Sequence, residues 1–279
     1  MKPLLNRKFL PKLISYTLLG VMLIISLFPI YWMAITSIKS LGEIYKLNPT
    51  FWPEDINLSG YIYLFNKSDY LSWLLNSSVV SIVSSLVTML FCIPAAYGLV
   101  RFNFRGRGLI GNSILIAYLL PPTLIFIPIY IMVTRIGLTQ SIWGLLLIYP
   151  STTIPYATWI LTSYFKSIPS EFDDAARIDG CSRLQVLIKV IIPLASPGIV
   201  STFILSYTLC WSEYLYALVI LSGRTKTLPL GISSMLFGDV ARWNTIMGGA
   251  IIATIPILII YTIASKYIVS GLSLGGLKG

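Results

Sequence analysis

The sequence contains no histidine, and only 11% of its 279 residues are charged. Without histidine it lacks the commonest general base, proton relay and metal ligand of proteins. No G-x-x-x-x-G-K-[ST] loop occurs, so the chain does not bind ATP in the P-loop manner, and G-x-S-x-G, H-E-x-x-H and C-x-x-C motifs are absent too. Three scattered cysteines, Cys92, Cys181 and Cys210, form neither a disulfide framework nor a metal site. No catalytic residue and no metal ligand is therefore predicted.

What the chain has in abundance is apolar sequence: 56% of the residues are hydrophobic and the mean hydropathy is +0.82. A soluble domain usually carries about 25% charged residues, and an apolar run of roughly 20 residues crosses a bilayer as a helix. We expect an all-α protein, a polytopic membrane helical bundle that forms one transmembrane domain over residues 1–279. The six expected transmembrane helices cover about 13–37, 73–100, 108–134, 138–165, 197–222 and 244–270.

The distribution of basic residues predicts the orientation. The N-terminus, the loop "RFNFRGRG", the segment 166–192 and the C-terminal end hold most of the 20 Lys and Arg residues. Because cytoplasmic loops carry an excess of these residues, this set of loops and both termini are expected to face the cytoplasm. The net charge of +10 is explained by these span ends, and no nucleic-acid partner is expected.

A charged stretch, "PSEFDDAARIDGCSRL" at 169–184, interrupts the apolar sequence on the cytoplasmic side. Ser170 and Asp173 have the spacing of a capping box, and Gly180 supplies a helix stop. Acidic residues gather in the first turn, where the helix dipole favours negative charge. The pattern predicts a short helix; its acids are Glu171, Asp173, Asp174 and Asp179.

A second short helix is predicted directly after Gly180. Ser182 and Gln185 form another capping box, and Pro193 ends the apolar pattern. The stripe at helical spacing consists of Leu184, Leu187, Ile188 and Ile191. Two capped amphipathic helices within the segment 166–193 are too polar to span the membrane and too regular for a passive loop.

Small residues distinguish the first helix. Phe172, Ala175 and Ala176 share one face by i, i+3, i+4 spacing, and the alanines leave that face slim enough to lie in a groove of another protein. The helix pair could instead lie on the membrane surface or pack beneath its own bundle. Clustered acids, which anionic headgroups would repel, favour a docking element.

Glu213 is the one acidic residue within the six expected spans. It could be a structural residue near the outer end of the fifth span, hydrogen-bonded by neighbours such as Trp211 and Tyr214, or it could line a polar pathway. Prolines inside the third and fourth spans, among them Pro121 and Pro122, predict kinked helices in a bundle that encloses space.

The stretch "EFDDAARIDGCSRLQVLIKVIIPLASPG" resembles the EAA loop of the permeases of binding-protein-dependent ABC importers. Asp174, Ala175, Ala176 and Gly180 match its acid, two alanines and glycine, and "ARIDG" is typical of the carbohydrate-uptake branch with its MalG-like subunits. "WSEYLYAL" at 211–218, "TLPLGISS" at 227–234 and the tail "GLSLGGLKG" also resemble that branch. Asp174 stands where the motif has Glu, so the charge is kept and the reach is one methylene shorter.

The resemblance implies a six-span permease with a cytoplasmic coupling helix, in the prokaryotic inner membrane. The implied partners are a second, MalF-like permease subunit, two ATPase subunits that hold ATP and Mg, an extracytoplasmic solute-binding protein and the lipid bilayer; this chain binds no cofactor. The tail Gly275 to Gly279 is expected to reach toward the ATPase subunits. The implied ATPase-coupling residues are Glu171, Asp173, Asp174, Ala175, Ala176, Asp179 and Gly180, and the expected translocation path includes Trp211, Glu213 and Tyr214.

Three alternatives stay open. An ion-coupled secondary transporter usually needs several ionisable groups inside the membrane, and Glu213 alone supports it thinly. A membrane enzyme that acts on lipid is disfavoured because histidine and paired intramembrane carboxylates are absent. An ABC permease for another solute, such as a peptide, a polyamine or a glycerol phosphodiester, differs from the sugar permease only in its cargo.

Overall fold

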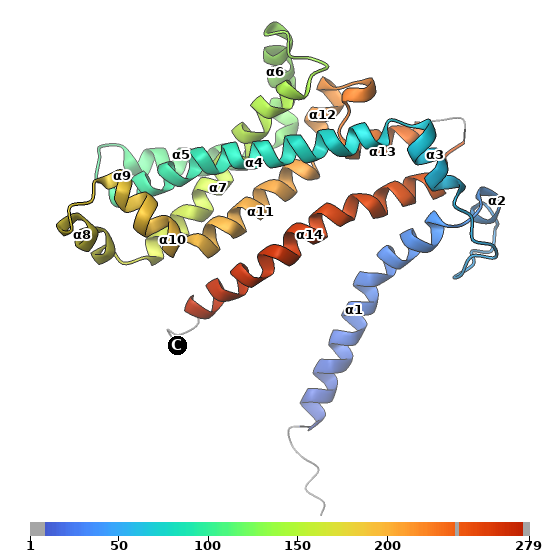
Figure 1. The fold of residues 1–279 in the computed structure, drawn as a ribbon, viewed down its shortest axis with the longest axis horizontal. Helices are drawn as coiled ribbons and strands as arrows, with labels where there is room; N and C mark the ends of the chain where they lie inside the picture. Colours follow the sequence, from blue (N-terminus) through green and yellow to red (C-terminus); the bar gives the residue numbers. More distant parts are fainter. Residues whose placement is uncertain (1–8, 238–239, 276–279) are drawn as a thin grey trace, which may run out of the picture. The chain divides into compact units, whose positions relative to one another are not determined.

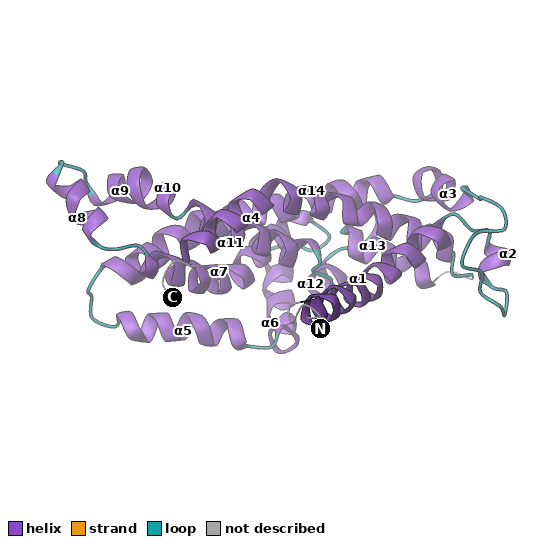
Figure 2. Cartoon of the chain, turned by 90° about the horizontal axis from the view of Figure 1, so that it is seen from below, coloured by secondary structure: helices purple, strands orange, loops and turns teal. Residues whose placement is uncertain are grey.

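The computed structural model describes residues 9–237 and 240–275, and every regular element within these ranges is a helix (Figures 1 and 2). The described residues contain three helices long and apolar enough to cross a membrane, or up to five if each of two bent helix pairs counts as one span. The chain divides into two compact units. Unit 1 comprises 1–70 and 232–254, and unit 2 comprises 71–231 and 255–279. The predicted single domain over 1–279 stays a prediction.

In unit 1 the helix α3 packs against the beginning of α14. Gly60 of α3 lies so close to the α14 backbone that an added Cβ would come within 2.9 Å of the Asn244 carbonyl carbon. The Tyr70 hydroxyl donates a hydrogen bond of 2.7 Å to the Gly249 carbonyl oxygen, and Leu64 is fully buried. Unit 1 contains α1 (Phe9–Ser37), α2 (Leu41–Ile44), α3 (Ser59–Lys67), η3 (Met235–Phe237) and the first part of α14 (Trp243–Gly275).

Unit 2 holds the remaining elements. Their bounds are α4 (Tyr70–Arg101), α5 (Arg107–Leu119), α6 (Pro122–Arg135), α7 (Ile142–Ser167), α8 (Glu171–Ile178), α9 (Arg183–Val186), the π-helix η1 (Leu187–Ile191), α10 (Ile192–Leu194), α11 (Ser196–Trp211), α12 (Leu215–Ile220), η2 (Gly223–Thr225) and α13 (Leu228–Ser234), whose last residues belong to unit 1.

Small hydroxyl side chains fill the contact between α4 and α7. The Thr88 and Thr153 hydroxyls lie 2.6 Å apart, and both residues are buried. Each hydroxyl also bonds a carbonyl one turn earlier in its own helix, so both hydroxyls are paired. Membrane helices associate through such small and hydroxyl-bearing residues because lipid offers no hydrophobic driving force between them.

Two predicted spans are broken helices. The expected span 108–134 consists of α5 and α6, which meet at an angle of 95° at Pro121 and Pro122. The helical segments Arg183–Leu194 and Ser196–Trp211 meet at 81°, and the expected fifth span, 197–222, continues through a separate short helix, α12. The kink predicted at Pro121 and Pro122 is confirmed, because a proline cannot donate to the carbonyl one turn back.

The expected span 138–165 corresponds to α7, which is not among the candidate spans. Its 26 residues are long enough, but Pro150, Pro155 and the intervening hydroxyl residues 151–153 make it less apolar than α1, α4 and α14. The spans expected at 13–37, 73–100 and 244–270 match α1, α4 and α14. The count of six transmembrane helices therefore stays a proposal.

Candidate functional site

The charged stretch forms the helix α8, at one end of unit 2 (Figure 1). Its first turn carries Glu171, Asp173 and Asp174, as expected for the positive end of a helix dipole. Gly180 has a φ of +87°, and the Cys181 and Gly180 amides donate to the Ala176 and Arg177 carbonyls. This double bond pattern is a Schellman motif, so the predicted glycine stop is confirmed.

The two alanines of α8 face opposite environments. Ala176 is buried together with Asp173, whereas Ala175 is exposed. The stripe of Phe172, Ala175 and Ala176 is not exposed as a whole: Phe172 and Ala175 are exposed, whereas Ala176, at its edge, turns toward the chain itself with Asp173. The exposed residues of α8 and its C-terminal end are Glu171, Phe172, Asp174, Ala175, Arg177, Ile178 and Asp179.

One of the two predicted capping boxes is present. Ser182 accepts a hydrogen bond from the Gln185 amide, and the Gln185 side chain accepts one from the Ser182 amide, which confirms the second box. Ser170 has helical dihedral angles and no side-chain cap, so the predicted first box is wrong. The Asp173 amide donates to the Ser170 carbonyl instead of the Ser170 hydroxyl, and the Asp173 carboxylate is bound elsewhere.

Arg101 and Tyr97, at the end of α4, hold that carboxylate. The Arg101 Nε lies 2.9 Å from Asp173 Oδ2, and the Tyr97 hydroxyl donates a hydrogen bond of 2.8 Å to Asp173 Oδ1. The Arg101 guanidinium also donates 2.8 Å to the Ile168 carbonyl, just before α8. Since both charged side chains are nearly nine-tenths buried, this arrangement fixes α8 to the end of α4. We call Tyr97, Arg101 and Asp173 the α4–α8 clamp.

An apolar core continues the attachment beneath α8 and α9. Ala176 and Val186 pack with Leu161 and Phe165 of α7 and with Ile191 of η1. Arg183, at the start of α9, lies over the Phe102 ring at 4.6 Å, and that ring packs edge-on against Tyr97. Through these contacts, α8 and α9 form a rigid extension of α4 and α7 rather than a loose loop.

Glu213 lies beside a cavity of about 580 Å³ in unit 2. Of the residues expected on the translocation path, Tyr214 also lines this cavity but Trp211 does not: its indole is buried and stacks on Tyr207 at 5.6 Å. Tyr118 and Tyr149 join the wall from α5 and α7, and no local pattern predicts their place there. The polar and aromatic lining residues are Tyr118, Tyr149, Ser151, Thr152, Thr153, Ser212, Glu213, Tyr214 and Tyr216.

The Glu213 carboxylate has a structural role as well as a place on the cavity wall. It accepts 2.9 Å and 3.2 Å hydrogen bonds from the Tyr216 and Ala217 amides and 2.7 Å from the Tyr149 hydroxyl. It therefore caps the first turn of α12 and joins α12 to α7. The structural interpretation therefore holds, with Tyr149 and backbone amides as the partners, and a place on a polar pathway stays a prediction.

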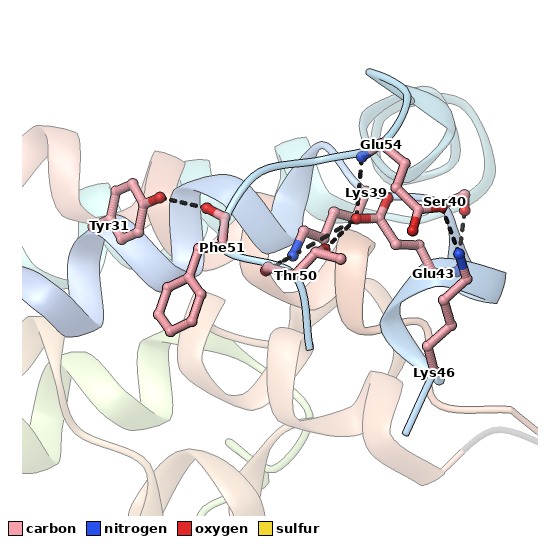
Figure 3. A network of polar contacts seen from close by, with 8 residues as sticks. All are labelled: Tyr31, Lys39, Ser40, Glu43, Lys46, Thr50, Phe51 and Glu54. Carbon is pink, nitrogen blue, oxygen red and sulfur yellow. Dashed lines mark hydrogen bonds and ion pairs between the residues drawn. The ribbon is translucent and has the colours of Figure 1, made fainter. Parts of the chain in front are cut away.

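In unit 1, a polar network closes the loop between α1 and α3 (Figure 3). Glu43 Oε1 accepts a hydrogen bond of 2.5 Å from the Thr50 hydroxyl and lies 3.8 Å from the Lys39 ammonium. Burial alone would raise the pKa of the Glu43 carboxyl. The Thr50 hydrogen bond and other polar neighbours outweigh this effect, so its pKa lies below the ordinary 4.5. Lys39 also donates to the Thr50 carbonyl, and Tyr31 donates to the Phe51 carbonyl.

No group of three or more Cys, Asp or Glu residues in the described part of the chain could hold a metal ion. Cys92, Cys181 and Cys210 are free cysteines. The expected tail contact at Gly275 to Gly279 lies outside the described residues except for Gly275.

Comparisons with known proteins agree on one family. A family model described as "Binding-protein-dependent transport system inner membrane component" matches residues 88–273. The inner membrane ABC transporter permease protein YcjP of Escherichia coli (strain K12) is 34% identical over 277 residues, which cover 98% of this chain and 99% of that protein. The trehalose/maltose transport system permease protein MalG of Thermococcus litoralis is 32% identical over 268 residues, covering 92% and 94%.

A solved structure has the same fold. It is a chain of a bacterial ABC transporter involved in the import of the acidic polysaccharide alginate. The two chains superpose with a TM-score of 0.78 at 25% sequence identity, covering 95% of this chain and 99% of that one.

Proposed function

Because this chain belongs to the family of binding-protein-dependent transport system inner membrane components, we propose that it passes a sugar or oligosaccharide across the membrane as a permease subunit of an ATP-binding-cassette importer. ATP hydrolysis resides on separate subunits, so the chain is not an enzyme. The observation that carries the proposal is α8, a capped helix that is fixed to α4 by the α4–α8 clamp and leaves an acidic side outward.

The outward side of α8 is the proposed contact with an ATPase subunit. Glu171, Asp174 and Asp179 supply negative charge, and Ala175 leaves room for close approach. Asp173 and Ala176 support the same contact from the opposite side by holding α8 in place. When the ATPase dimer closes, a helix held in this way passes the movement to α4 and α7 as a rigid lever. The turn at Gly180 ends α8 and fixes the direction of the chain that follows it.

The membrane arrangement follows from the same proposal. In the proposed arrangement six spans are formed by α1, α4, the α5–α6 pair, α7, α11 with α12, and α14, and both termini and α8 lie in the cytoplasm of a prokaryotic cell. A second, MalF-like permease subunit completes the pathway, and two ATPase subunits bind ATP and Mg. An extracytoplasmic binding protein delivers the solute to the opposite side.

A carbohydrate cargo is supported by two relatives and by the chemistry of the cavity. The relative MalG is named for trehalose and maltose, and the superposed transporter imports the polysaccharide alginate. In this chain, a cavity of about 580 Å³ presents tyrosine rings, hydroxyls and the Glu213 carboxylate. Aromatic faces pack on sugar rings and a carboxylate accepts hydroxyl hydrogen bonds, and the volume lies within the roughly 300–1,000 Å³ of small-molecule sites. Glu213 and Tyr214 are the residues we assign to the path.

Reconstitution tests the proposal. The chain is co-purified with its second permease and ATPase subunits, placed in proteoliposomes, and supplied with its binding protein and labelled oligosaccharides. We expect uptake to require ATP and loaded binding protein and to be unaffected by ionophores that collapse ion gradients. Uptake that follows the ion gradient without ATP would instead show a secondary transporter.

The cargo is tested separately, by calorimetry on the isolated binding protein. Saccharides are compared with polyamines, peptides and glycerol phosphodiesters. Tight binding of a saccharide supports the sugar assignment. Tight binding of only a phosphodiester, peptide or polyamine would leave the ABC permease intact and replace its cargo.

A further inference from the structure

A second cavity in unit 2, of about 250 Å³, lies where α5 meets α7, near the cytoplasmic ends of the proposed spans. The α5 side contributes small residues one helical turn apart, Gly108, Gly111 and Asn112. The α7 side contributes Thr158, and two further α7 residues, Thr162 and Lys166, follow it at intervals of one helical turn. The remaining lining residues are Leu99, Arg107, Ile114, Leu115 and Trp159.

The charges that line this cavity are all positive. Arg107 and Lys166 belong to the wall, and no Asp or Glu is among the lining residues. Arg107 donates to the Asn103 side chain at 2.9 Å and to the Val100 carbonyl at 3.4 Å, and a guanidinium has five N–H donors, so three remain to bind an anion. Lys166 is exposed and forms no ion pair with the described part of the chain. An anion in the cavity would meet two cations without a competing carboxylate.

A buried hydroxyl without a partner points to a missing ligand. Thr158 is 1% exposed, and its Oγ1 has no hydrogen-bond partner among the described residues, although it lines the cavity. A buried polar group left unpaired costs about 1–3 kcal/mol, so such groups normally have a partner. One helical turn onward, the Thr162 hydroxyl donates a hydrogen bond to the Thr158 carbonyl. The Thr158 hydroxyl does not make the equivalent bond to a carbonyl of the preceding turn.

The first turn of α5 adds peptide donors. Gly106 precedes the 13-residue helix with a φ of +90°, and no side chain caps it. The free N–H groups and the positive end of the helix dipole favour an anion at this position. The Gly108 and Gly111 Cα atoms have open space around them, because an added Cβ would meet nothing within 4 Å.

We propose that this cavity binds the phosphate group of an anionic phospholipid such as phosphatidylglycerol. The phosphate contacts Lys166, Arg107, the Thr158 hydroxyl and the first turn of α5, and the lipid glycerol and acyl chains lie along Leu99, Ile114 and the exposed apolar surface of α5. Basic pockets between membrane helices at the cytoplasmic side bind lipid headgroups in this way. Assignment to the cytoplasmic leaflet rests on the proposed topology, but lipid binding itself does not require transport.

The test compares two lipids on one protein. The detergent-purified transporter complex is delipidated and titrated with phosphatidylglycerol or phosphatidylcholine, and bound lipid is counted by native mass spectrometry. We expect phosphatidylglycerol to bind more tightly than phosphatidylcholine. Lys166→Gln should weaken phosphatidylglycerol roughly fivefold, since a basic residue near a lipid surface contributes about 1 kcal/mol. Lys12→Gln, which removes an exposed lysine outside the cavity, serves as the matched control and should change nothing.

Two further variants separate binding from folding. Thr158→Val keeps the volume and removes the hydroxyl, so it should weaken phosphatidylglycerol by up to about tenfold while the melting temperature in phosphatidylcholine stays the same or rises. Gly111→Leu fills open space and should abolish the lipid preference. Equal affinity for both lipids, or unchanged affinity in Lys166→Gln and Thr158→Val, would overturn the proposal.

Soluble anions distinguish the source of the phosphate. Inorganic phosphate and glycerol 3-phosphate, at millimolar concentration, should neither displace phosphatidylglycerol nor raise the melting temperature. If either anion stabilises the protein as well as the lipid does, and Lys166→Gln removes that effect, the site belongs to a soluble phosphate and the lipid assignment is wrong.

Discussion

Loss of the α4–α8 clamp should uncouple the transporter without unfolding it. The perturbation is Asp173→Asn, which keeps the size of the side chain and removes its charge. Arg101 then lies in a nearly buried position without its ionic partner, while Tyr97 still has an oxygen to bond. The rest of the apolar core beneath α8 is untouched.

The magnitude follows from the geometry of the pair. Removing one partner of a buried ion pair costs about 3–5 kcal/mol. The Arg101 and Asp173 side chains retain 12% and 10% of their exposure, so the lower limit, about 3 kcal/mol, applies here. A change of about 3 kcal/mol raises the fraction of detached α8 by roughly a hundredfold.

The assay is ATP hydrolysis by the reconstituted complex, with and without loaded binding protein. We expect the stimulated rate to fall and the unstimulated rate to persist. Arg101→Gln should give the same defect, and the double variant should be little worse than either single one, because both remove a single interaction. Arg105→Gln, a neighbouring exposed arginine, is the matched control. Normal stimulation in Asp173→Asn, or additive defects in the double variant, would refute the role of the clamp.

Further predictions concern both units. Ala175→Arg should leave the melting temperature nearly unchanged, because Ala175 is exposed, but abolish stimulated ATP hydrolysis; normal stimulation would refute the docking assignment. Gly180→Pro should do the same through the turn, since proline cannot adopt a φ of +87°, and a Gly180→Ala variant with a milder defect would support this reason. Glu213→Gln should destabilise the protein by about 1–3 kcal/mol in thermal unfolding, as three hydrogen bonds weaken. Because its pKa is lowered in the folded protein, Glu43 stabilises above pH about 4.5 and loses this contribution as the pH falls through its folded pKa; a melting-temperature series from pH 6 to 3.5 should show the loss, and Glu43→Gln should remove it.

Local features of α8 and α9 could be predicted from the sequence because their causes lie within a few residues. The Gly180 turn and the Ser182–Gln185 box depend only on backbone geometry and on neighbours three residues away. The acids in the first turn respond to the dipole of their own helix. Short-range rules therefore identified the segment and its boundaries.

The errors arose where a distant partner decided the outcome. Ser170 and Asp173 have the right spacing for a cap, but Arg101, far away in the sequence, binds the Asp173 carboxylate more strongly than a backbone amide would. The same contact turns Ala176 inward and separates it from Ala175. Periodicity defines the faces of a helix but not which face meets the protein.

The cavity beside Glu213 also shows that sequence patterns do not predict distant partners. Glu213 and Tyr214 were identified because a charge inside an apolar span is rare. Tyr149 joins them from α7, and its hydroxyl bond to Glu213 has no local signal. Trp211 is expected beside them because aromatic faces pack on sugar rings, but the helical turn of α11 places it against Tyr207 instead.

The π-helical turn η1 interrupts the α-helical hydrogen bonding between α9 and α10. Pro193 has no amide hydrogen for the Lys189 carbonyl, and the Ile192 amide reaches back five residues to Leu187. The segment between α9 and α10 thus contains one residue more than an α-helical turn would. Rewinding it to α-helical pitch would rotate α9 by about 100° and shift it by about 1.5 Å relative to α10. The contacts of Ala176 and Val186 with α7 would have to break for this to happen, so that core holds the extra residue in place.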